Sequence, residues 1–305
     1  MATVSAPQDR VRSTSSSPRR LPVATGDRPE SRVKVGLYLL AAVLSLLVFV
    51  VPLLWALLRS LQPAATITAA PNLSTFFKLT LDNFRNLSSI ATIPQAILNS
   101  ILVSVGTAVL TMLLATAAGY GFGRFTFRGS GVAFGLILVT LMIPFQAILT
   151  PLFLEMNAMH LTDSRLGLVL FYSTVNLPFG VFVMRTAFAS VPNELEDAAN
   201  VDGAGTIRTL VSVLRPLVVP GMATTALYAF LASWTEFLGA LTFLTRQELY
   251  TLPVALLNLQ QGAYGSIDYG LLAAGSIIAM IPCVVLFVTL QRYYVAGLSA
   301  GAVKG

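Results

Sequence analysis

The sequence contains few charged residues and almost no cysteine or histidine, and these shortages exclude several classes of protein. Only 10% of its 305 residues are charged, whereas soluble domains carry about a quarter. The charge is therefore too sparse to cover a water-facing globule. The single cysteine, Cys283, excludes an intrachain disulfide and a cysteine-based metal cluster. The single histidine, His160, is not a metal site by itself, and we expect no bound metal.

The sequence also lacks the motifs of ATP binding and of intramembrane catalysis. It has no G-x-x-x-x-G-K-[ST] loop and so cannot bind ATP in that way. Its apolar runs hold no Ser–His arrangement, histidine cluster or acidic pair, which an enzyme site inside a membrane needs. We therefore expect no catalytic residue and no cofactor of its own. The net charge of +6 does not by itself indicate nucleic acid, and we expect no such partner.

Long hydrophobic runs dominate the rest of the chain. The composition is 55% hydrophobic and the mean hydropathy is +0.78. About 20 apolar residues in a helix cross the roughly 30 Å hydrocarbon core of a bilayer. Six runs reach that length: 35–58, 94–121, 132–155, 165–188, 217–243 and 270–293. The sequence therefore predicts an all-α membrane protein with six transmembrane helices, although Asn176 and Pro178 interrupt the fourth run.

The basic residues predict how the chain is oriented. Residues 1–32 are rich in Ser, Pro and Arg and have too few large apolar side chains to fold, so we expect a disordered basic tail. The first run is longer than the core of a signal peptide, which favours a retained span. Residues 33–305 then form one membrane domain. Most of the 19 lysines and arginines lie on the side of the N-terminus, which places both termini in the cytosol.

A polar stretch of about residues 191–216 separates the fourth and fifth spans. Glu194, Glu196 and Asp197 stand in what we predict as the first turn of a helix, where the helix dipole favours negative charge. Asp202–Gly203 is a turn signal that ends this helix. A second short helix, at about 205–214, then leads into the fifth span.

This predicted helix–turn–helix lies on the cytosolic face, and its partner can be a lipid surface or a protein. Helices that lie on membranes prefer Lys and Arg on their polar face. The acidic first turn therefore favours a protein partner. Ala198 and Ala199 follow that turn and keep the helix slim, so that another surface can approach it closely.

The same stretch resembles the EAA loop of ABC-importer permeases. Asp197-Ala198-Ala199 is followed by Gly203 and Pro216 at the spacing of that loop, and Asp202-Gly203-Ala204 is similar to its sugar-importer version. Asp197 stands where glutamate is usual, and Arg215 where an apolar residue is usual. The resemblance implies that an ATPase binds this loop, and it leaves open whether Glu196 or Asp197 makes the contact. The implied coupling residues are Glu196, Asp197, Ala198, Ala199, Asp202, Gly203 and Ala204.

Two further segments resemble the same family. The last 15 residues, QRYYVAGLSAGAVKG, are similar to the ending of maltose-transporter-type permeases. That likeness implies a tail, at about 294–305, that reaches between two ATPase subunits. The implied contact residues are Gly297, Leu298, Ser299, Ala300, Gly301 and Lys304. A looser likeness covers residues 230–244, where Thr235 departs from the usual Asn.

The resemblance implies a permease subunit that forms half of the translocation pathway of an ATP-driven importer, in the bacterial cytoplasmic membrane. The implied partners are a second permease subunit, two ATPase subunits that bind the ATP, an extracytoplasmic substrate-binding protein and the lipid bilayer. A disaccharide or oligosaccharide is the expected substrate, with glycerol phosphate or an amino sugar as alternatives. An ion-coupled transporter working alone is a further alternative. Such carriers often have internal repeats and several intramembrane acids, and neither is evident in the sequence.

Glu236 is predicted to lie inside the outer half of the fifth span, where a carboxylate is costly and usually faces a cavity or a partner. With Trp234 and Thr235 beside it, it can belong to a sugar-contacting patch. It can equally be a structural carboxylate bonded to a neighbouring helix. Gly119, Gly121 and Gly123 at the end of the second span are predicted to allow close helix approach.

Overall fold

The computed structural model describes residues 32–63, 78–261 and 268–302, and the side chains of residues 34–289 within those ranges. All of the regular structure in the described ranges is helical. The chain divides between Val51 and Pro52 into two units. This boundary lies inside helix α1 (Arg32–Leu61). The basic tail predicted for residues 1–32 lies outside the described residues, apart from Arg32 at the start of α1.

The first unit contributes the N-terminal part of α1, a helix with no buried face of its own. Residues 34–49 are all exposed, and the large hydrophobic side chains among them include Leu37, Leu40 and Phe49. Such a surface is stable only in an apolar solvent. This segment therefore agrees with the prediction of a first transmembrane span.

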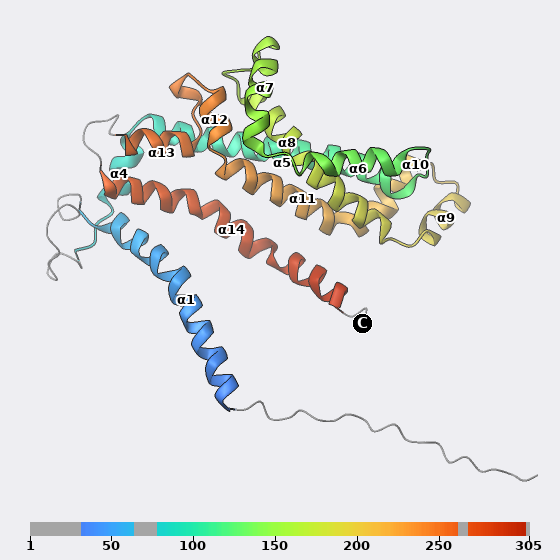
Figure 1. Cartoon of the computed structure of the whole chain (residues 1–305), viewed down its shortest axis with the longest axis horizontal. Helices are drawn as coiled ribbons and strands as arrows, with labels where there is room; N and C mark the ends of the chain where they lie inside the picture. Colours follow the sequence, from blue (N-terminus) through green and yellow to red (C-terminus); the bar gives the residue numbers. More distant parts are fainter. Residues whose placement is uncertain (1–31, 64–77, 262–267, 303–305) are drawn as a thin grey trace, which may run out of the picture. The chain divides into compact units, whose positions relative to one another are not determined.

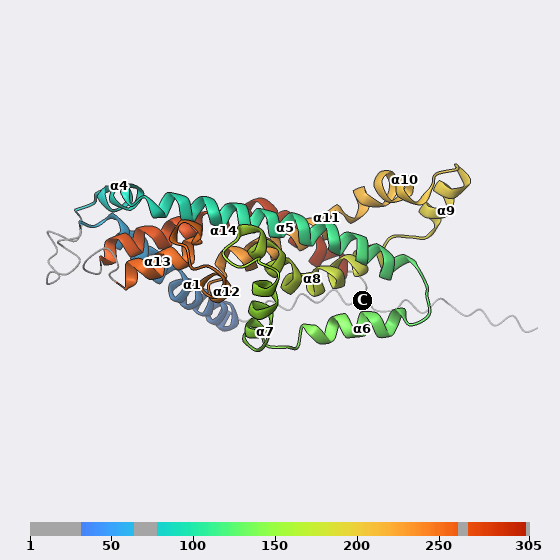
Figure 2. The same ribbon diagram turned by 90° about the horizontal axis from the view of Figure 1, so that it is seen from above.

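The second unit contains the end of α1 and all the other helices (Figures 1 and 2). Its helices are α4 (Asp82–Ser89), α5 (Thr92–Arg124), α6 (Ser130–Thr140), α7 (Phe145–Ala158), α8 (Arg165–Ala189), α9 (Glu194–Val201), α10 (Thr206–Arg208), a π-helix (Thr209–Leu214), α11 (Arg215–Thr235), α12 (Leu238–Phe243), a 3₁₀ helix (Gln247–Leu249), α13 (Leu252–Gln260) and α14 (Tyr269–Ala302). In both views α9 lies at one end of this unit, and α4 and α13 lie at the other.

Helices α5, α8 and α11 pack against one another and form the centre of the second unit. Gly119 shows how closely α5 and α8 approach, because a Cβ atom placed there would lie 2.4 Å from the Cβ of Met184. At Gly123 a Cβ would lie 2.9 Å from the Cβ of Phe188. The predicted close approach is therefore confirmed at these two glycines. It is wrong for Gly121, which has nothing within 4 Å of its Cβ position.

The prediction of six membrane spans is confirmed for five of them. Among the described residues, five helices are long and apolar enough to cross a membrane, and a sixth span exists only if α6 and α7 are counted as one. Those two helices are bent by 99°, so the third predicted span, 132–155, is not a single straight helix. Pro144 has an extended backbone (φ −58°, ψ 130°) just before α7. Because proline also disfavours the helical conformation of the residue before it, α6 cannot run on into α7.

The fourth and fifth spans also differ from expectation. Helix α8 runs through Asn176 and Pro178 without a break, partly because the buried Asn176 amide is satisfied by the carbonyl of Tyr172, at 2.7 Å. The fifth span ends at Thr235 rather than near residue 243, because the chain bends at Glu236 and restarts as α12. Its start joins the π-helix directly, so the second short helix predicted at 205–214 is continuous with the span.

At the end of the second unit opposite α9, a buried amide connects α5 to α8 and to the segment after α12. Asn99 on α5 is fully buried, and its Nδ2 donates to the carbonyl oxygens of Glu248 and Tyr250 at 2.9 Å each. Its Oδ1 accepts from Nε of Arg165, also at 2.9 Å. The segment after α12 is thereby attached to both α5 and α8.

Candidate functional site: the α9 helix and its connections

Helix α9 has the local structure that the sequence predicts for the polar loop. Glu194, Glu196 and Asp197 lie in its first turn. At its end the N–H of Ala204 donates to the carbonyl of Ala199 and that of Gly203 to the carbonyl of Asn200, at 2.9 and 3.0 Å. These two bonds form a Schellman motif, which needs a left-handed residue. Gly203 supplies it with a φ of +75°.

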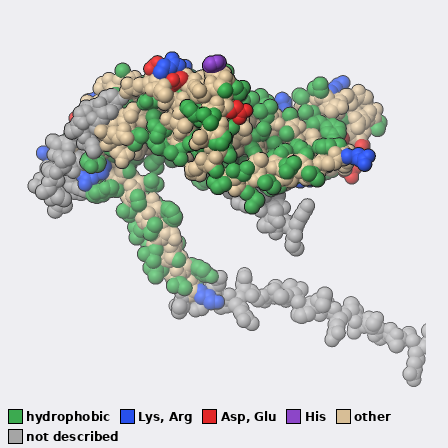
Figure 3. Space-filling model, turned by 45° about the horizontal axis from the view of Figure 1, so that its top comes forward, with side chains coloured by type: hydrophobic (Ala, Val, Ile, Leu, Met, Phe, Trp, Pro, Cys, Tyr) green, Lys and Arg blue, Asp and Glu red, His purple; other side chains and the backbone are tan. Residues whose placement is uncertain are grey.

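The outward side of α9 and of the turn after it combines apolar side chains with exposed carboxylates. Val201 is 88% exposed and Ile207, just after the turn, is 78% exposed. Asp197, Ala198 and Asp202 are also exposed. Ala199 is buried, on a helix that packs against the π-helix. On the face drawn in Figure 3, hydrophobic side chains are widespread and only a few charged side chains lie among them.

Glu196 differs from Asp197 in that it is bound within the chain. Its Oε1 lies 2.9 Å from Nε of Arg124, at the end of α5. The Nε–H is not aimed at this oxygen, so the contact is an ion pair rather than a hydrogen bond. Nη1 of Arg124 also donates to Oδ1 of Asn193 at 2.6 Å. The side chain of Arg124 is only 5% exposed and that of Glu196 is 22% exposed.

The sequence does not predict a site role for Arg124, which counts there only among the basic residues that orient the chain. It is 72 positions away from Glu196 by number, so no spacing pattern connects the two. The available signal is that Arg124 directly follows a long apolar run with no acidic residue near it in the sequence, so that any acidic partner comes from another segment. We name the contacts of Arg124 with Glu196 and Asn193 the α5–α9 contact.

A second connection links α9 to the membrane-spanning helices through the chain itself. The turn after α9 leads into α10, then into the π-helix, and then into α11 without interruption. Leu214, at the end of the π-helix, is fully buried in a cluster with Met184 and Phe188 of α8. Helix α9 is therefore connected to α11 through the backbone and to α5 through Arg124.

The three residues predicted as a substrate patch face different neighbours. The carboxylate of Glu236 accepts hydrogen bonds from the backbone N–H groups of Leu238 and Gly239, at 2.8 Å each, and from the hydroxyl of Tyr172, at 2.6 Å. This geometry agrees with the alternative of a structural carboxylate, because it stabilises the start of α12 and binds α8. Trp234 is 3% exposed, and its Nε1 donates to the carbonyl of Ala279 on α14 at 2.9 Å.

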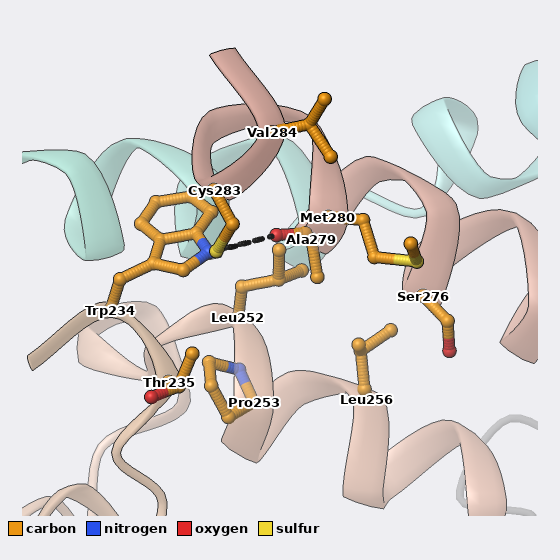
Figure 4. A pocket seen from close by; sticks show the side chains of 10 residues that line it. All are labelled: Trp234, Thr235, Leu252, Pro253, Leu256, Ser276, Ala279, Met280, Cys283 and Val284. Atoms are coloured by element: carbon orange, nitrogen blue, oxygen red, sulfur yellow. Dashed lines mark hydrogen bonds between the residues drawn. The ribbon is translucent and has the colours of Figure 1, made fainter. Parts of the chain in front are cut away.

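Trp234 and Thr235 line an apolar pocket of about 370 Å³, and Glu236 does not (Figure 4). The other lining residues come from α13 and α14, and they are Leu252, Pro253, Leu256, Ser276, Ala279, Met280, Cys283 and Val284. The hydroxyls of Thr235 and Ser276 already donate to carbonyls of their own helices. The pocket thus offers little hydrogen bonding to a hydroxyl-rich ligand.

At the end opposite α9, Asp163 binds the segment after α12. Its carboxylate accepts from the N–H groups of Thr245 and Arg246, at 2.6 and 3.1 Å, and from the hydroxyl of Thr245. Burial acts to raise the pKa of Asp163, but these hydrogen bonds outweigh it and lower that pKa below its usual value.

The predicted C-terminal contact residues are described only in part. Helix α14 continues past the expected end of the sixth span at residue 293 and reaches Ala302. The backbone of Gly297, Leu298, Ser299, Ala300 and Gly301 is therefore helical. Alanine favours helices, and the segment has no proline to stop one. Lys304 lies outside the described residues.

Comparison with known proteins identifies the family. The model of the family described as "Binding-protein-dependent transport system inner membrane component" matches residues 112–299, more than half of the chain. The chain belongs to this family. This inner-membrane component is 34% identical over 254 residues to the trehalose transport system permease protein SugB of Mycobacterium tuberculosis, covering 83% of this chain and 92% of SugB.

A second relative supports the same assignment, and a solved structure shows the same fold. The arabinooligosaccharides transport system permease protein AraQ of Halalkalibacterium halodurans is 35% identical to this inner-membrane component over 262 residues, covering 84% of this chain and 91% of AraQ. A bacterial ABC transporter involved in alginate import has a solved structure with a TM-score of 0.76 and 21% identity, covering 88% of this chain and 99% of that one. At that identity the likeness shows the fold alone. The resemblance to ABC-importer permeases noted in the sequence is thus confirmed.

Proposed function

We propose that this chain is one of two permease subunits of an ATP-driven importer and forms half of the pathway for a disaccharide or oligosaccharide. The permease relatives named for trehalose and arabinooligosaccharides support a sugar substrate. The sequence has no ATP-binding loop of its own. The proposed partners are therefore a second permease subunit, two ATPase subunits that hydrolyse ATP, and an extracytoplasmic substrate-binding protein.

The observation that carries this proposal is the exposed surface of α9. A rigidly capped helix lies at one end of the bundle with Asp197, Ala198 and Val201 uncovered. Apolar side chains beside exposed carboxylates fit an apolar socket that contains a cationic residue. A transporter working alone would not need such a surface, whereas an importer driven by a separate ATPase does.

The proposed orientation places α9 and both termini in the cytosol. The bias of Lys and Arg toward that side supports it. The loop that contains Asp163 and the segment after α12 would then face the substrate-binding protein. The helical backbone of residues 297–301 continues toward the same cytosolic side as α9 in this arrangement, and we propose that it contacts the ATPase subunits.

In the proposed mechanism, ATP-driven closure of the ATPase subunits displaces α9. The displacement is passed to α11 through the π-helix, and π-helical segments are frequent at functional sites. Motion of the transmembrane helices then changes the side of the membrane to which the sugar pathway is open. Of the three residues proposed for that pathway, Thr235 is exposed. Trp234 and Glu236 act indirectly in this proposal, because their hydrogen bonds fix the positions of α14 and α12.

A matched pair of glycine substitutions tests the role of α9. Gly203→Val places a β-branched residue at a φ of +75°, which costs roughly 1–2 kcal/mol in backbone strain and disrupts the end of α9. Gly205→Val is the control, since Gly205 has a φ of −73° and a ψ of 165°, which valine adopts readily. The chain is co-expressed with companion permease and ATPase subunits of sugar importers, and the ATPase is used for affinity capture in mild detergent.

We expect wild type and Gly205→Val to co-purify with the ATPase and to stimulate ATP hydrolysis, and Gly203→Val to lose both. Uptake is then measured with trehalose, an arabinooligosaccharide, glycerol phosphate and an amino sugar. If wild type associates with no ATPase and drives sugar uptake from an ion gradient without ATP, the proposal is wrong and the chain is a transporter working alone.

A further inference from the structure

Two carboxylates of α9 are neighbours in sequence, but they face different surroundings. Glu196 is partly buried and paired with Arg124, whereas Asp197 is exposed and has no ion-pair partner in the described structure. Successive residues on a helix point about 100° apart. One carboxylate therefore faces the α5 end, and the other is available to a partner protein.

Arg124 is placed to control the position of α9. Helix α5 has 33 residues and is about 50 Å long at 1.5 Å per residue, so it extends beyond the roughly 30 Å hydrocarbon core. Arg124 is its last residue. The side chain reaches α9 at two points, through Nε to Glu196 and through Nη1 to Asn193.

The remaining attachments of α9 are less directional. Helix α9, whose Ala199 is buried, packs against the π-helix, and the chain enters and leaves α9 through the short segments 190–193 and 202–205. Apolar packing of one small side chain fixes distance but not rotation. Arg124 holds α9 at two points three residues apart, by an ion pair with Glu196 and by a hydrogen bond from Nη1 to Oδ1 of Asn193. Attachment at two points restricts the rotation of α9 as well as its distance from α5, and the hydrogen bond adds a defined direction.

We propose that Arg124 is the positioning residue that fixes α9 relative to α5, so that Glu196 serves this internal contact and Asp197 serves the partner ATPase. The inference rests on the proposed function and identifies which carboxylate acts in it. Loss of the α5–α9 contact leaves α9 able to bind the ATPase, but part of its displacement is then absorbed by rotation of α9 and does not reach α5.

The proposal predicts that Arg124→Ala uncouples ATP hydrolysis from sugar transport without dissociating the permease from the ATPase. In the reconstituted importer, ATPase capture and ATP hydrolysis stay close to wild type. Trehalose transported per ATP hydrolysed falls by on the order of threefold or more. Arg128→Ala is the matched control, because Arg128 is exposed and follows α5 by four positions. Glu196→Gln is expected to act like Arg124→Ala, and Glu194→Gln in the same turn like wild type.

A charge exchange distinguishes positioning from general loss of structure. In the double variant Arg124→Glu with Glu196→Arg the ion pair is reversed, and the amide of Asn193 can donate to the new carboxylate. We expect at least partial recovery of transport per ATP. Arg124→Glu alone should lose transport per ATP as Arg124→Ala does. If the defect came only from loss of the arginine side chain from the end of α5, it would persist in the double variant, which also lacks that arginine.

The position of α9 is measured directly with two spin labels. Cysteines replace Val201 on α9 and Leu114 on α5, both of which are exposed, in a Cys283→Ser background. The distance distribution is expected to be narrow in wild type and Arg128→Ala, broad in Arg124→Ala, and narrow again in the double variant. If Arg124→Ala matches wild type in both distance and coupling, the inference is wrong while the proposed function stands. If wild type binds no ATPase at all, the proposed function itself is wrong.

Discussion

The packing of α5 on α8 allows a prediction of opposite effects at two glycines that are two residues apart. In Gly119→Ala the new Cβ would lie 2.4 Å from the Cβ of Met184 and 2.8 Å from the backbone N of Arg185. Carbon atoms in contact are about 3.5–4.0 Å apart, so the two helices must separate by roughly 1 Å. A rotamer change cannot relieve the overlap, because backbone atoms take part in it.

The expected cost follows from overpacking, which destabilises by about 1–3 kcal/mol. Gly121→Ala is the control on the same helix, since nothing lies within 4 Å of its Cβ position. Alanine favours a helix over glycine by up to about 1 kcal/mol. Gly121→Ala should therefore be neutral or slightly stabilising, while Gly119→Ala is clearly destabilising.

The assay is the free energy of unfolding in mixed micelles, from a denaturing-detergent titration followed by circular dichroism. Arg124 lies five residues beyond Gly119 on α5, so separation of the helices should also reduce transport in the assembled importer. If the unfolding free energies of the two variants agree within about 0.5 kcal/mol, the close approach of α5 and α8 is not what stabilises this part of the fold.

Three further predictions use the same unfolding assay. Asn99→Leu leaves two backbone carbonyls unpaired and should cost about 2–4 kcal/mol, with faster proteolysis of residues 244–251 as a second readout. Trp234→Phe keeps an aromatic side chain but removes the pyrrole ring together with its hydrogen bond to Ala279. It should cost about 0.5–1.5 kcal/mol for the hydrogen bond and a further loss for the cavity left at this buried position. Asp163→Asn tests pH dependence. Because the folded pKa of Asp163 is lowered, its ionised form adds stability above the unfolded pKa of about 4, and this is lost as the pH falls through the folded pKa. Wild type should thus exceed Asp163→Asn at pH 7 and converge with it toward pH 3.

The sequence predicts the elements that depend on local pattern. Runs of apolar residues locate the membrane helices, and the turn signal at Asp202–Gly203 places the end of α9 where the structure has it. Both follow from rules that act over a few neighbouring residues. The resemblance of the loop around Gly203 to the EAA loop then points to the family.

Features that depend on partners distant in sequence are not predicted. Proline alone does not say where a span breaks, since α8 continues through Pro178 while the chain turns sharply at Pro144. The difference lies in the surroundings, because α8 is enclosed by α5 and α11 and the segment at Pro144 is not. Glu236 likewise sits within an apolar run in the sequence, and only the structure reveals that it binds the start of α12 and Tyr172.

The most direct test of the central claim is site-specific crosslinking of α9 to an ATPase subunit. In a Cys283→Ser background the chain has no cysteine, so a single cysteine can be placed at Val201 on α9 or, as a control, at Met159 just after α7. Both positions are exposed, at 88% and 59%, and they lie at different parts of the molecule. The account predicts that a short bifunctional reagent joins position 201, and not position 159, to the co-expressed ATPase, and that ATP changes the yield. Crosslinking from 159 but not from 201, or from neither with any importer ATPase, would contradict it.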